Sequence, residues 1–521
     1  MDAIKEPGAR AVADHGLDSP GPLPPAGQRG TPRLAIGLIA AAGFAVELAV
    51  SGRYGYVRDE LYFLACGQHL ALGYVDQPAL TPLLARLSAV ATGNSLVGLR
   101  LLPALGLAAL VVLTAAMSRL AGAGRTGQVL AALAAATCGE YLGAMHELTT
   151  TVPDFCCWAL TLLLVLKLLL SRDPRWWLAI GGCAGVAASA KWNIGFLVAA
   201  LAAGFAVTDA RALLRSRYLL IGCALAVVLA APDVIWQAAH GWPNLAVFRA
   251  LAQQAWHNRV VYWPGQAVYT GLALTPVWIA GLAWTLRRPA ARPLRAAGIG
   301  CTLAIAVQFA LGGKAYYSGG AYTFLLAMGA IPLERRLAAR RPLFGIIRPA
   351  VAMGGAMLAS AVLIMPAALP VLPAAVLRTV PLQRINYDLA ESIAWPKQVA
   401  LVAREYRALP PALRRRTAIL AGNYGEAGAI ERYGSADGLP GAYSGANSFW
   451  YWGPPPATDA SAIAINVDPA LLRREFGHVR LLATFRNGIG VADDEQGAQI
   501  FLATGLKTTW ARAWAAFRNF S

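Results

Sequence analysis

The stretch LLPALGLAALVVLTAAM, Leu101–Met117, contains no charged residue. Two further stretches, WALTLLLVLKLLL at Trp158–Leu170 and VAMGGAMLASAVLIMPAALPV at Val351–Val371, hold a single lysine between them. A helix needs about 20 apolar residues to cross the hydrocarbon core of a bilayer. Over the 521 residues, 57% are hydrophobic and 14% are charged, whereas a soluble domain carries about 25% charged residues. These features predict a polytopic, mainly α-helical membrane protein.

The apolar segments divide the chain into three parts. Residues 1–33 are rich in Pro and Gly and predict a disordered cytoplasmic tail. Residues 34–374 predict a transmembrane domain, and residues 375–521 predict a small extracytoplasmic α/β domain. The eleven predicted spans lie near residues 34–50, 97–118, 127–145, 152–170, 176–190, 193–208, 217–237, 265–286, 296–312, 321–333 and 349–372.

The net charge of +18 raises the alternative of a nucleic-acid-binding protein, but the basic residues are distributed as in a membrane protein. With the N-terminus inside, the inner segments hold twenty Lys and Arg residues, and the longer outer loops hold eight. Basic residues accumulate on the cytoplasmic side of membrane proteins. We therefore expect a multi-pass protein of the cell inner membrane, with a cytoplasmic N-terminus and an extracytoplasmic C-terminal domain.

Carboxylates show the opposite distribution. The inner loops of the membrane domain hold only Asp173, Asp209 and Glu334. The outer ends of the spans hold Glu47, Asp59, Glu60, Asp76, Glu140, Glu147, Asp154 and Asp233. One interpretation is that acidic residues simply gather outside and cap helices. Because charges at bilayer depth are costly and usually functional, we expect instead a shared polar cavity that faces the outer leaflet.

The first outer loop, residues 51–96, is long for a connection between two spans, and long ordered loops are commonly functional. It contains the pair Asp59-Glu60, then the run Leu-Tyr-Phe-Leu, and later the turn Asp76-Gln77-Pro78. The run after the acidic pair predicts a short amphipathic helix that lies on the membrane surface with its aromatic side down.

These motifs resemble the first loop of the GT-C superfamily of membrane glycosyltransferases, especially the protein O-mannosyltransferases and the lipid A aminoarabinose transferases (families 39 and 83). The resemblance continues through His146-Glu147 and Pro153-Asp154, where the family places an Asp at the head of an apolar helix. It extends to Lys191 and to Gly313-Lys314-Ala-Tyr316-Tyr317, and so covers most of residues 34–375. One departure is Gln77, where relatives often carry Lys, so that a phosphate contact there would lose its charge.

The resemblance implies a GT-C fold and an inverting displacement, in which an acceptor hydroxyl attacks the anomeric carbon and polyprenyl phosphate leaves. Such a reaction needs one carboxylate as general base, and Asp59 is the candidate; the alternative for it is a helix N-cap. Glu60 is a second catalytic candidate, which orients Asp59 or binds a metal, or else supports the helix N-terminus electrostatically. Asp76 and Asp154 are candidates to share a divalent cation, Mg²⁺ or Mn²⁺, with the donor phosphate. No other cofactor is expected.

The candidate phosphate-binding lysines follow from composition. The chain has six lysines against 39 arginines, so a Lys at the outer end of a span, as at Lys191 and Lys314, indicates a phosphate partner. Snorkelling to lipid headgroups is the alternative. Further phosphate-binding candidates are Arg58, Tyr316 and Tyr317. In the loop at residues 238–264, Trp256 and Arg259 are candidates to cover the sugar or the acceptor, although an interfacial aromatic belt explains the same residues.

After residue 375 the pattern is that of a soluble α/β domain. Strands are predicted at 418–421, 462–467, 480–484 and 500–503, and helices at 390–408 and 470–476. The segment Gly422-Asn-Tyr-Gly-Glu-Ala-Gly resembles a nucleotide loop but lacks the Walker lysine and the dinucleotide spacing, so a strand-to-helix turn is favoured. The aromatic run at 447–452 is expected to contact a glycan or the membrane domain, and residues 510–520 to rest on the bilayer.

Together these features predict a membrane glycosyltransferase that moves a hexosyl or pentosyl unit from a polyprenyl-phosphate donor to a hydroxyl acceptor on the extracytoplasmic face. The acceptor class stays open among protein, lipid and cell-envelope glycan, and no nucleic-acid partner is expected. The alternatives are a lipid-linked sugar flippase, which should show internal repeats and a midplane site, and a non-enzymatic envelope assembly protein. A glycan ligase that uses a diphosphate lipid also stays open.

Overall fold

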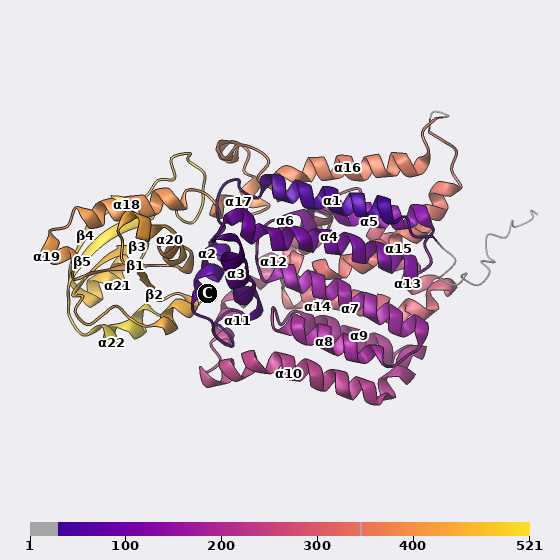
Figure 1. Cartoon of the computed structure of the whole chain (residues 1–521), viewed down its shortest axis with the longest axis horizontal. Helices are drawn as coiled ribbons and strands as arrows, with labels where there is room; N and C mark the ends of the chain where they lie inside the picture. The colour runs from indigo at the N-terminus through magenta and orange to yellow at the C-terminus, as the bar shows by residue number, and fades with distance from the viewer. Residues whose placement is uncertain (1–29, 344–345, 521) are drawn as a thin grey trace, which may run out of the picture.

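The computed structural model describes residues 30–343 and 346–520, so most of the predicted disordered tail lies outside the described residues (Figure 1). Helices dominate the chain up to residue 368. They are α1 (Arg33–Val50), α2 (Arg58–Gln68), α3 (Leu80–Thr92), α4 (Leu96–Leu120), α5 (Arg125–Ala136), α6 (Gly139–Ala144), α7 (Thr151–Ser171), α8 (Trp176–Ala188), α9 (Ile194–Ala206), α10 (Arg217–Ala239), α11 (Asn244–Gln253), α12 (Ala255–Thr270), α13 (Thr275–Arg287), α14 (Arg295–Leu311), α15 (Gly319–Ala338) and α16 (Pro349–Ala368).

Each of the eleven predicted spans overlaps one of these helices, but the count is not confirmed. Among the described residues, six helical segments are long and apolar enough to cross a membrane, or eight if each of two bent pairs forms one span. The span predicted at 265–286 is wrong as a single helix, because α12 and α13 meet at an angle of 105°. Gly271, with φ +100°, ends α12 there.

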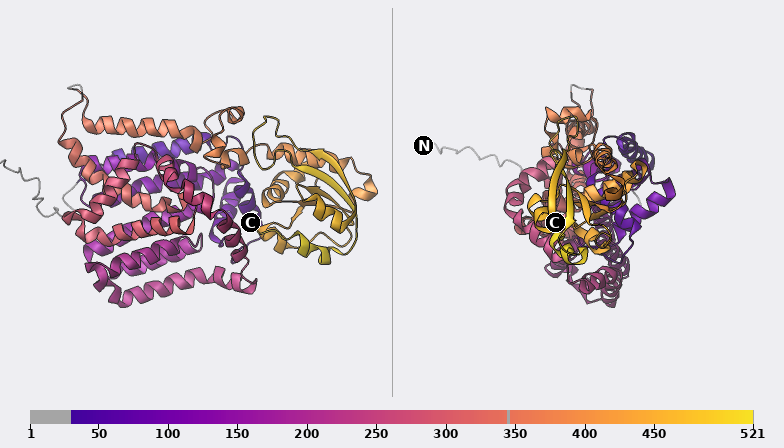
Figure 2. Two further views of the ribbon diagram at one scale, coloured as in Figure 1. Left: turned by 180° about the vertical axis from the view of Figure 1, so that it is seen from behind. Right: turned by 90° about the vertical axis from the view of Figure 1, so that its left-hand side faces the viewer.

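The long helices lie side by side (Figures 1 and 2), and glycines allow some of them to approach closely. A Cβ added at Gly181 of α8 would overlap the backbone of Gly222 in α10, and one added at Gly281 of α13 would overlap the backbone of Leu325 in α15. Small residues at such crossings let helices approach closely in lipid, where dispersion contacts rather than water exclusion favour association.

The segments predicted on the inner side meet at one end of the bundle. The backbone N–H groups of Gly124 and Gly127 donate to Glu334 at 2.7 and 2.9 Å. Arg292 forms an ion pair with Asp209 at 2.9 Å. The C-terminal α/β region lies at the opposite end (Figure 1). The predicted inner segments and the C-terminal region therefore lie at opposite ends of the bundle, as predicted. Which end faces the cytoplasm stays a prediction.

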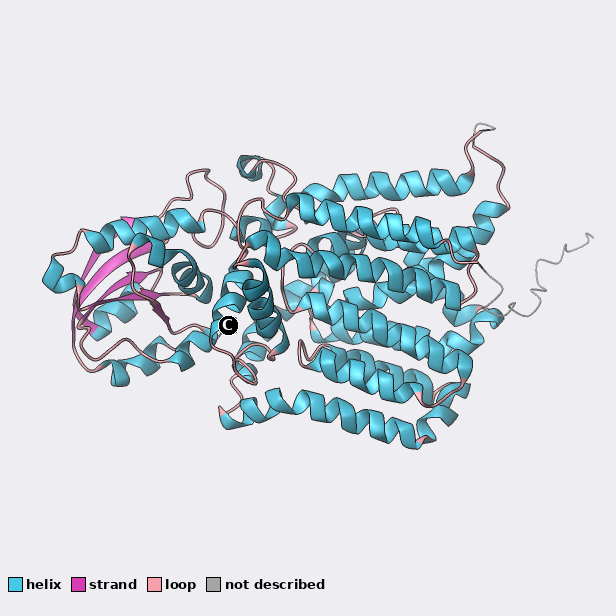
Figure 3. Cartoon of the chain, viewed as in Figure 1, coloured by secondary structure: helices cyan, strands magenta, loops and turns pink. Residues whose placement is uncertain are grey.

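The C-terminal region contains a five-stranded sheet in the order β2-β1-β3-β5-β4 (Figure 3). Its strands are β1 (Thr417–Ala421), β2 (Ala442–Ser444), β3 (Ser461–Ile465), β4 (Phe476–Thr484) and β5 (Gln499–Leu506). Strand β1 pairs in parallel with β2 and β3, and β5 pairs antiparallel with β3 and β4. The four predicted strands are present, and the short β2 was not predicted.

Alternate residues of the central strands enter two separate cores, as the period of two in a strand requires. Ile419 and Ile463 pack toward α18 (Trp395–Arg407) and α20 (Tyr424–Tyr433). Leu420 and Ala462 pack on the other face, with α21 (Pro469–Glu475) and α22 (Trp510–Ala513). The helix predicted at 390–408 is divided: α17 (Asp388–Glu391) ends before Ala394, whose φ of +69° breaks the helix.

The aromatic side chains of the two segments predicted to lie on the membrane surface, residues 61–64 and 510–520, are mostly buried. In α2, Tyr62 is 1% exposed and packs in one core with Trp395 of α18 and with residues of α20. Trp510 and Trp514 pack on the sheet. Both predictions of membrane-surface helices are therefore wrong, because the C-terminal domain supplies an apolar surface for each. The run at 447–452 does contact the first outer loop, where the Trp452 ring stacks 4.2 Å from that of His69.

Candidate functional site

A cavity of about 400 Å³ lies between the outer end of the helical bundle and the C-terminal region. Its lining combines residues from α2, from α6 and the turn after it, from the ends of α7, α12 and α16, from two loops between helices, and from the C-terminal region. The charged and phenolic side chains in this lining are Arg58, Asp59, Glu140, Glu147, Lys191, Tyr269, Lys314, Tyr316, Tyr387, Asp388, Glu391 and Tyr424. The structure thus brings several of the predicted site residues together in one cavity.

Asp59 lies in the first turn of α2 and lines the cavity. Its Oδ1 accepts a hydrogen bond from the Tyr424 hydroxyl at 3.0 Å. The alternative role as helix cap belongs instead to Glu60, whose Oε2 accepts the N–H of Val57 at 3.0 Å. Asp59 therefore does not cap α2, and its side chain faces the cavity.

Glu60, the second catalytic candidate, has structural contacts and does not line the cavity. It is fully buried and forms an ion pair with Arg100, with 2.7 Å between Nη2 and Oε2. Its Oε1 accepts from the Arg100 Nε at 3.0 Å and from the N–H of Leu148 at 3.2 Å. Because both oxygens are occupied and the residue does not line the cavity, Glu60 caps α2 and neutralises a buried arginine.

Lys191 and Lys314 enter the cavity from two different loops and share aromatic neighbours. The Lys191 ammonium lies 4.6 Å from the ring centroid of Tyr317 and 5.3 Å from that of Tyr316. The Lys314 ammonium lies 6.0 Å from the Tyr316 ring. Within the described residues neither lysine is ion-paired with a carboxylate, and burial lowers the pKa of Lys191. Both side chains line the cavity.

The eight outer carboxylates do not all share this cavity. Asp59, Glu140 and Glu147 line it. The others are held elsewhere by separate partners; Glu47 contacts His146 at 3.1 Å, and Asp233 accepts from the Trp192 indole at 2.8 Å. The prediction of a shared cavity is thus correct for part of the set, and the remaining acids stabilise buried polar contacts.

The structure gives no support to the metal site predicted at Asp76 and Asp154. Asp76 accepts from the Tyr62 hydroxyl at 2.8 Å, and burial raises its pKa to about 7. Asp154 accepts from the Asn193 amide at 2.8 Å. Neither carboxylate lines the cavity, and the described part of the chain holds no group of three His, Cys, Asp or Glu side chains placed for a metal. The role of Asp76 and Asp154 as metal ligands stays a prediction.

The predicted sugar cover also lies away from the cavity. The segment at 238–264 forms α11 and the start of α12 rather than a loop. Trp256 is 75% exposed, and the Arg259 guanidinium is held by the carbonyl of Ala310 at 2.8 Å. Gln77 is buried and does not line the cavity. Tyr317 does not line the cavity, but its ring contacts the ammonium group of Lys191, which does.

The C-terminal region supplies site residues that were not predicted. Tyr387, Asp388 and Glu391 follow α16, and Tyr424 begins α20. Asp388 hydrogen-bonds with Glu147, and burial raises the pKa of both carboxyls. No spacing pattern relates these residues to the first loop, because Tyr424 lies 365 positions after Asp59.

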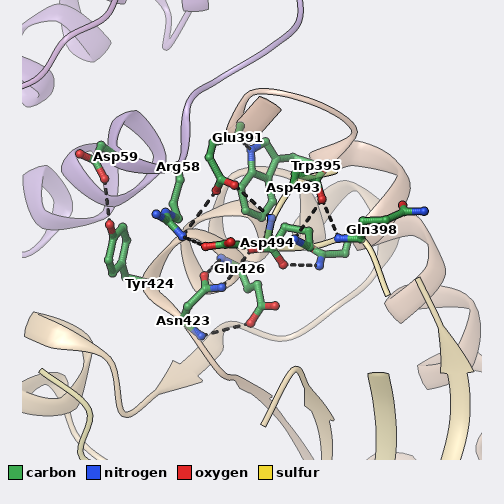
Figure 4. A network of polar contacts seen from close by, with 12 residues as sticks. Arg58, Asp59, Glu391, Trp395, Gln398, Asn423, Tyr424, Glu426, Asp493 and Asp494 are labelled. Carbon is green, nitrogen blue, oxygen red and sulfur yellow. Dashed lines mark hydrogen bonds and ion pairs between the residues drawn. The ribbon is translucent and has the colours of Figure 1, made fainter. Parts of the chain in front are cut away.

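Arg58 links the two regions through its charge. Its guanidinium lies 3.0 Å from Asp494 and 3.5 Å from Glu391 (Figure 4). It also lies 5.4 Å from the Tyr424 ring. The predicted phosphate-binding role of Arg58 therefore competes with an observed role in docking the C-terminal region.

Comparisons with known proteins agree with the motifs and the fold. A family model described as dolichyl-phosphate-mannose-protein mannosyltransferase matches residues 76–236. Two crystal structures of ArnT from Cupriavidus metallidurans are similar over 90% of this chain and 97% of theirs. The one bound to undecaprenyl phosphate has a TM-score of 0.55 at 15% identity, and the apo one has 0.54 at 14%. No curated protein matches the chain.

The predicted likeness to GT-C membrane glycosyltransferases is confirmed, because the sequence match and the fold match point to the same group. The chain is thus a multi-pass membrane protein of ArnT-like fold. The roles of individual site residues are not tested by these comparisons and remain predictions.

Proposed function

We propose that the chain is a membrane glycosyltransferase that transfers a sugar from a polyprenyl-phosphate donor to a hydroxyl acceptor. The observation that carries the proposal is the cavity in which the carboxylate of Asp59 and the ammonium groups of Lys191 and Lys314 meet. The similarity to ArnT, whose structure holds undecaprenyl phosphate, supports a donor of this lipid class.

In the proposed reaction, the acceptor hydroxyl attacks the anomeric carbon of the donor sugar as Asp59 removes its proton. The bond between that carbon and the phosphate oxygen breaks, the configuration inverts, and the departing electron pair stays on polyprenyl phosphate. Lys191 and Lys314 stabilise the negative charge on the leaving phosphate, since cations aimed at a developing charge act strongly in a desolvated site. Such a leaving group departs without a second carboxylic acid, so one carboxylate is sufficient.

The test is transfer by the purified full-length protein from a panel of radiolabelled polyprenyl-phosphate hexoses and pentoses, with cell-envelope membranes as the acceptor source. We expect label to move from at least one donor into an acceptor fraction, together with release of polyprenyl phosphate. Intact donor across the whole panel would contradict the proposal. Movement of intact donor between leaflets of proteoliposomes, without cleavage, would favour the flippase alternative.

The proposed orientation places the cavity and the C-terminal domain on the extracytoplasmic side of the inner membrane. A reporter fused after Arg295 should then be active on the cytoplasmic side, and one fused after Ser392 on the extracytoplasmic side. The arginine-rich inner segments are the physical reason, because they resist translocation. Both reporters on one side would exclude the proposed topology.

A further inference from the structure

The segment at residues 422–428, Gly-Asn-Tyr-Gly-Glu-Ala-Gly, joins the end of β1 to α20. Its side chains fix its own backbone. The side-chain Oδ1 of Asn423 accepts the N–H of Glu426 at 2.9 Å, and the Glu426 carboxylate accepts the N–H groups of Gly422 and Asn423 at 2.9 and 3.1 Å. These bonds cap α20 and set the direction in which Tyr424, its first residue, projects.

Two glycines of this segment bring α20 into backbone contact with α2. A Cβ added at Gly425 would overlap the Arg58 side chain. A Cβ added at Gly428 would lie 2.9 Å from the backbone carbonyl of Leu61. Larger residues at these positions would separate the two helices, so this segment determines how closely the C-terminal domain docks on the first outer loop.

The close approach places the Tyr424 hydroxyl 3.0 Å from Asp59 Oδ1 (Figure 4). The Tyr424 ring lies 4.9 Å from the ring of Tyr62, which fixes its orientation. Burial, and then the charge of Asp59, raises the pKa of Tyr424, so the phenol stays protonated and is the donor in this bond. A carboxylate with one oxygen held in this way has a defined direction for its other oxygen.

We propose that the C-terminal domain completes the active site, and that Tyr424 is a positioning residue that aims the carboxylate of Asp59 at the acceptor hydroxyl. This inference rests on the proposed function, in which Asp59 is the general base. Arg58 reinforces the same docking through Glu391 and Asp494. The turn at 422–428 therefore holds the C-terminal region against α2, and the position of the catalytic carboxylate depends on this contact.

The test is Tyr424→Phe, which keeps the ring and its packing but removes the hydroxyl, in the full-length protein. We expect kcat to fall by about 10-fold to 100-fold, as for a displaced catalytic group, with the donor KM unchanged. The substitution also removes a hydrogen-bond donor from the carboxylate, which favours the protonated form of that carboxyl group. The acidic limb of the pH profile of kcat/KM should therefore move to higher pH. Tyr433→Phe, on the same helix, is the matched control and should keep wild-type kinetics.

Two comparisons separate failure of this inference from failure of the proposed function. If Asp59→Asn is inactive and Tyr424→Phe has wild-type kcat and an unmoved acidic limb, the positioning role is wrong and the base assignment stands. A fall in kcat without movement of the acidic limb would also overturn the inference, because it indicates packing alone. If Asp59→Asn keeps full turnover, the base assignment fails first.

Discussion

Asp59→Asn should lower turnover by about 10²–10⁴-fold, the usual effect of removing a general base, while the donor lipid still binds. The amide keeps the size and polarity of the side chain, and its oxygen can still accept from the Tyr424 hydroxyl, which lies 3.0 Å from Oδ1. It cannot remove the proton of the acceptor. The loss should therefore appear in single-turnover transfer and not in equilibrium binding of labelled donor.

Asp388→Asn is the informative companion, because Asp388 lines the same cavity and pairs with Glu147. If Asp59 is the base, Asp388→Asn should retain far more single-turnover transfer than Asp59→Asn. The reverse order would assign the base to the Glu147–Asp388 pair. Full turnover by Asp59→Asn would remove this residue from the mechanism.

Lys191→Ala and Lys314→Ala should each weaken use of the donor more than use of the acceptor. A charged contact removed from a desolvated site costs about 2–5 kcal/mol, which corresponds to a loss of about 30-fold to several thousand-fold in kcat/KM for the donor. The structure supports a large effect, because neither ammonium is ion-paired with a carboxylate within the described residues. Their charge is therefore available to a phosphate.

Lys167→Ala is the matched control. Lys167 also contacts an aromatic ring, with its ammonium 4.6 Å from the Trp176 centroid, but it lies near the end of α7 remote from the cavity. This variant should keep wild-type donor kinetics. If Lys191→Ala and Lys314→Ala also kept them, while remaining folded, the lysines would serve only the packing of Tyr316 and Tyr317.

The sequence predicted only part of the site. The resemblance of the Asp59-Glu60 pair to the GT-C first loop selected Asp59, and the scarcity of lysine selected Lys191 and Lys314. The structure brings all three to one cavity. The resemblance and the shared sidedness also selected Glu60, Asp76 and Asp154, each of which has a carboxylate oxygen that accepts a hydrogen bond from Arg100, Tyr62 and Asn193 respectively. A buried carboxylate in a binding cavity and one in a structural ion pair look alike in sequence, because both lie near the outer end of a span.

The sequence by itself determined the features that depend on local composition. A charge-free run of about 20 residues is long enough to cross a bilayer, so the long apolar helices were predictable. Tertiary structure alone decided which surfaces meet. The aromatic face of α2 is covered by α20 instead of lipid, and Tyr424 reaches Asp59 across 365 residues. Such contacts arise when regions far apart in the sequence pack together, and no local pattern encodes the geometry of that packing.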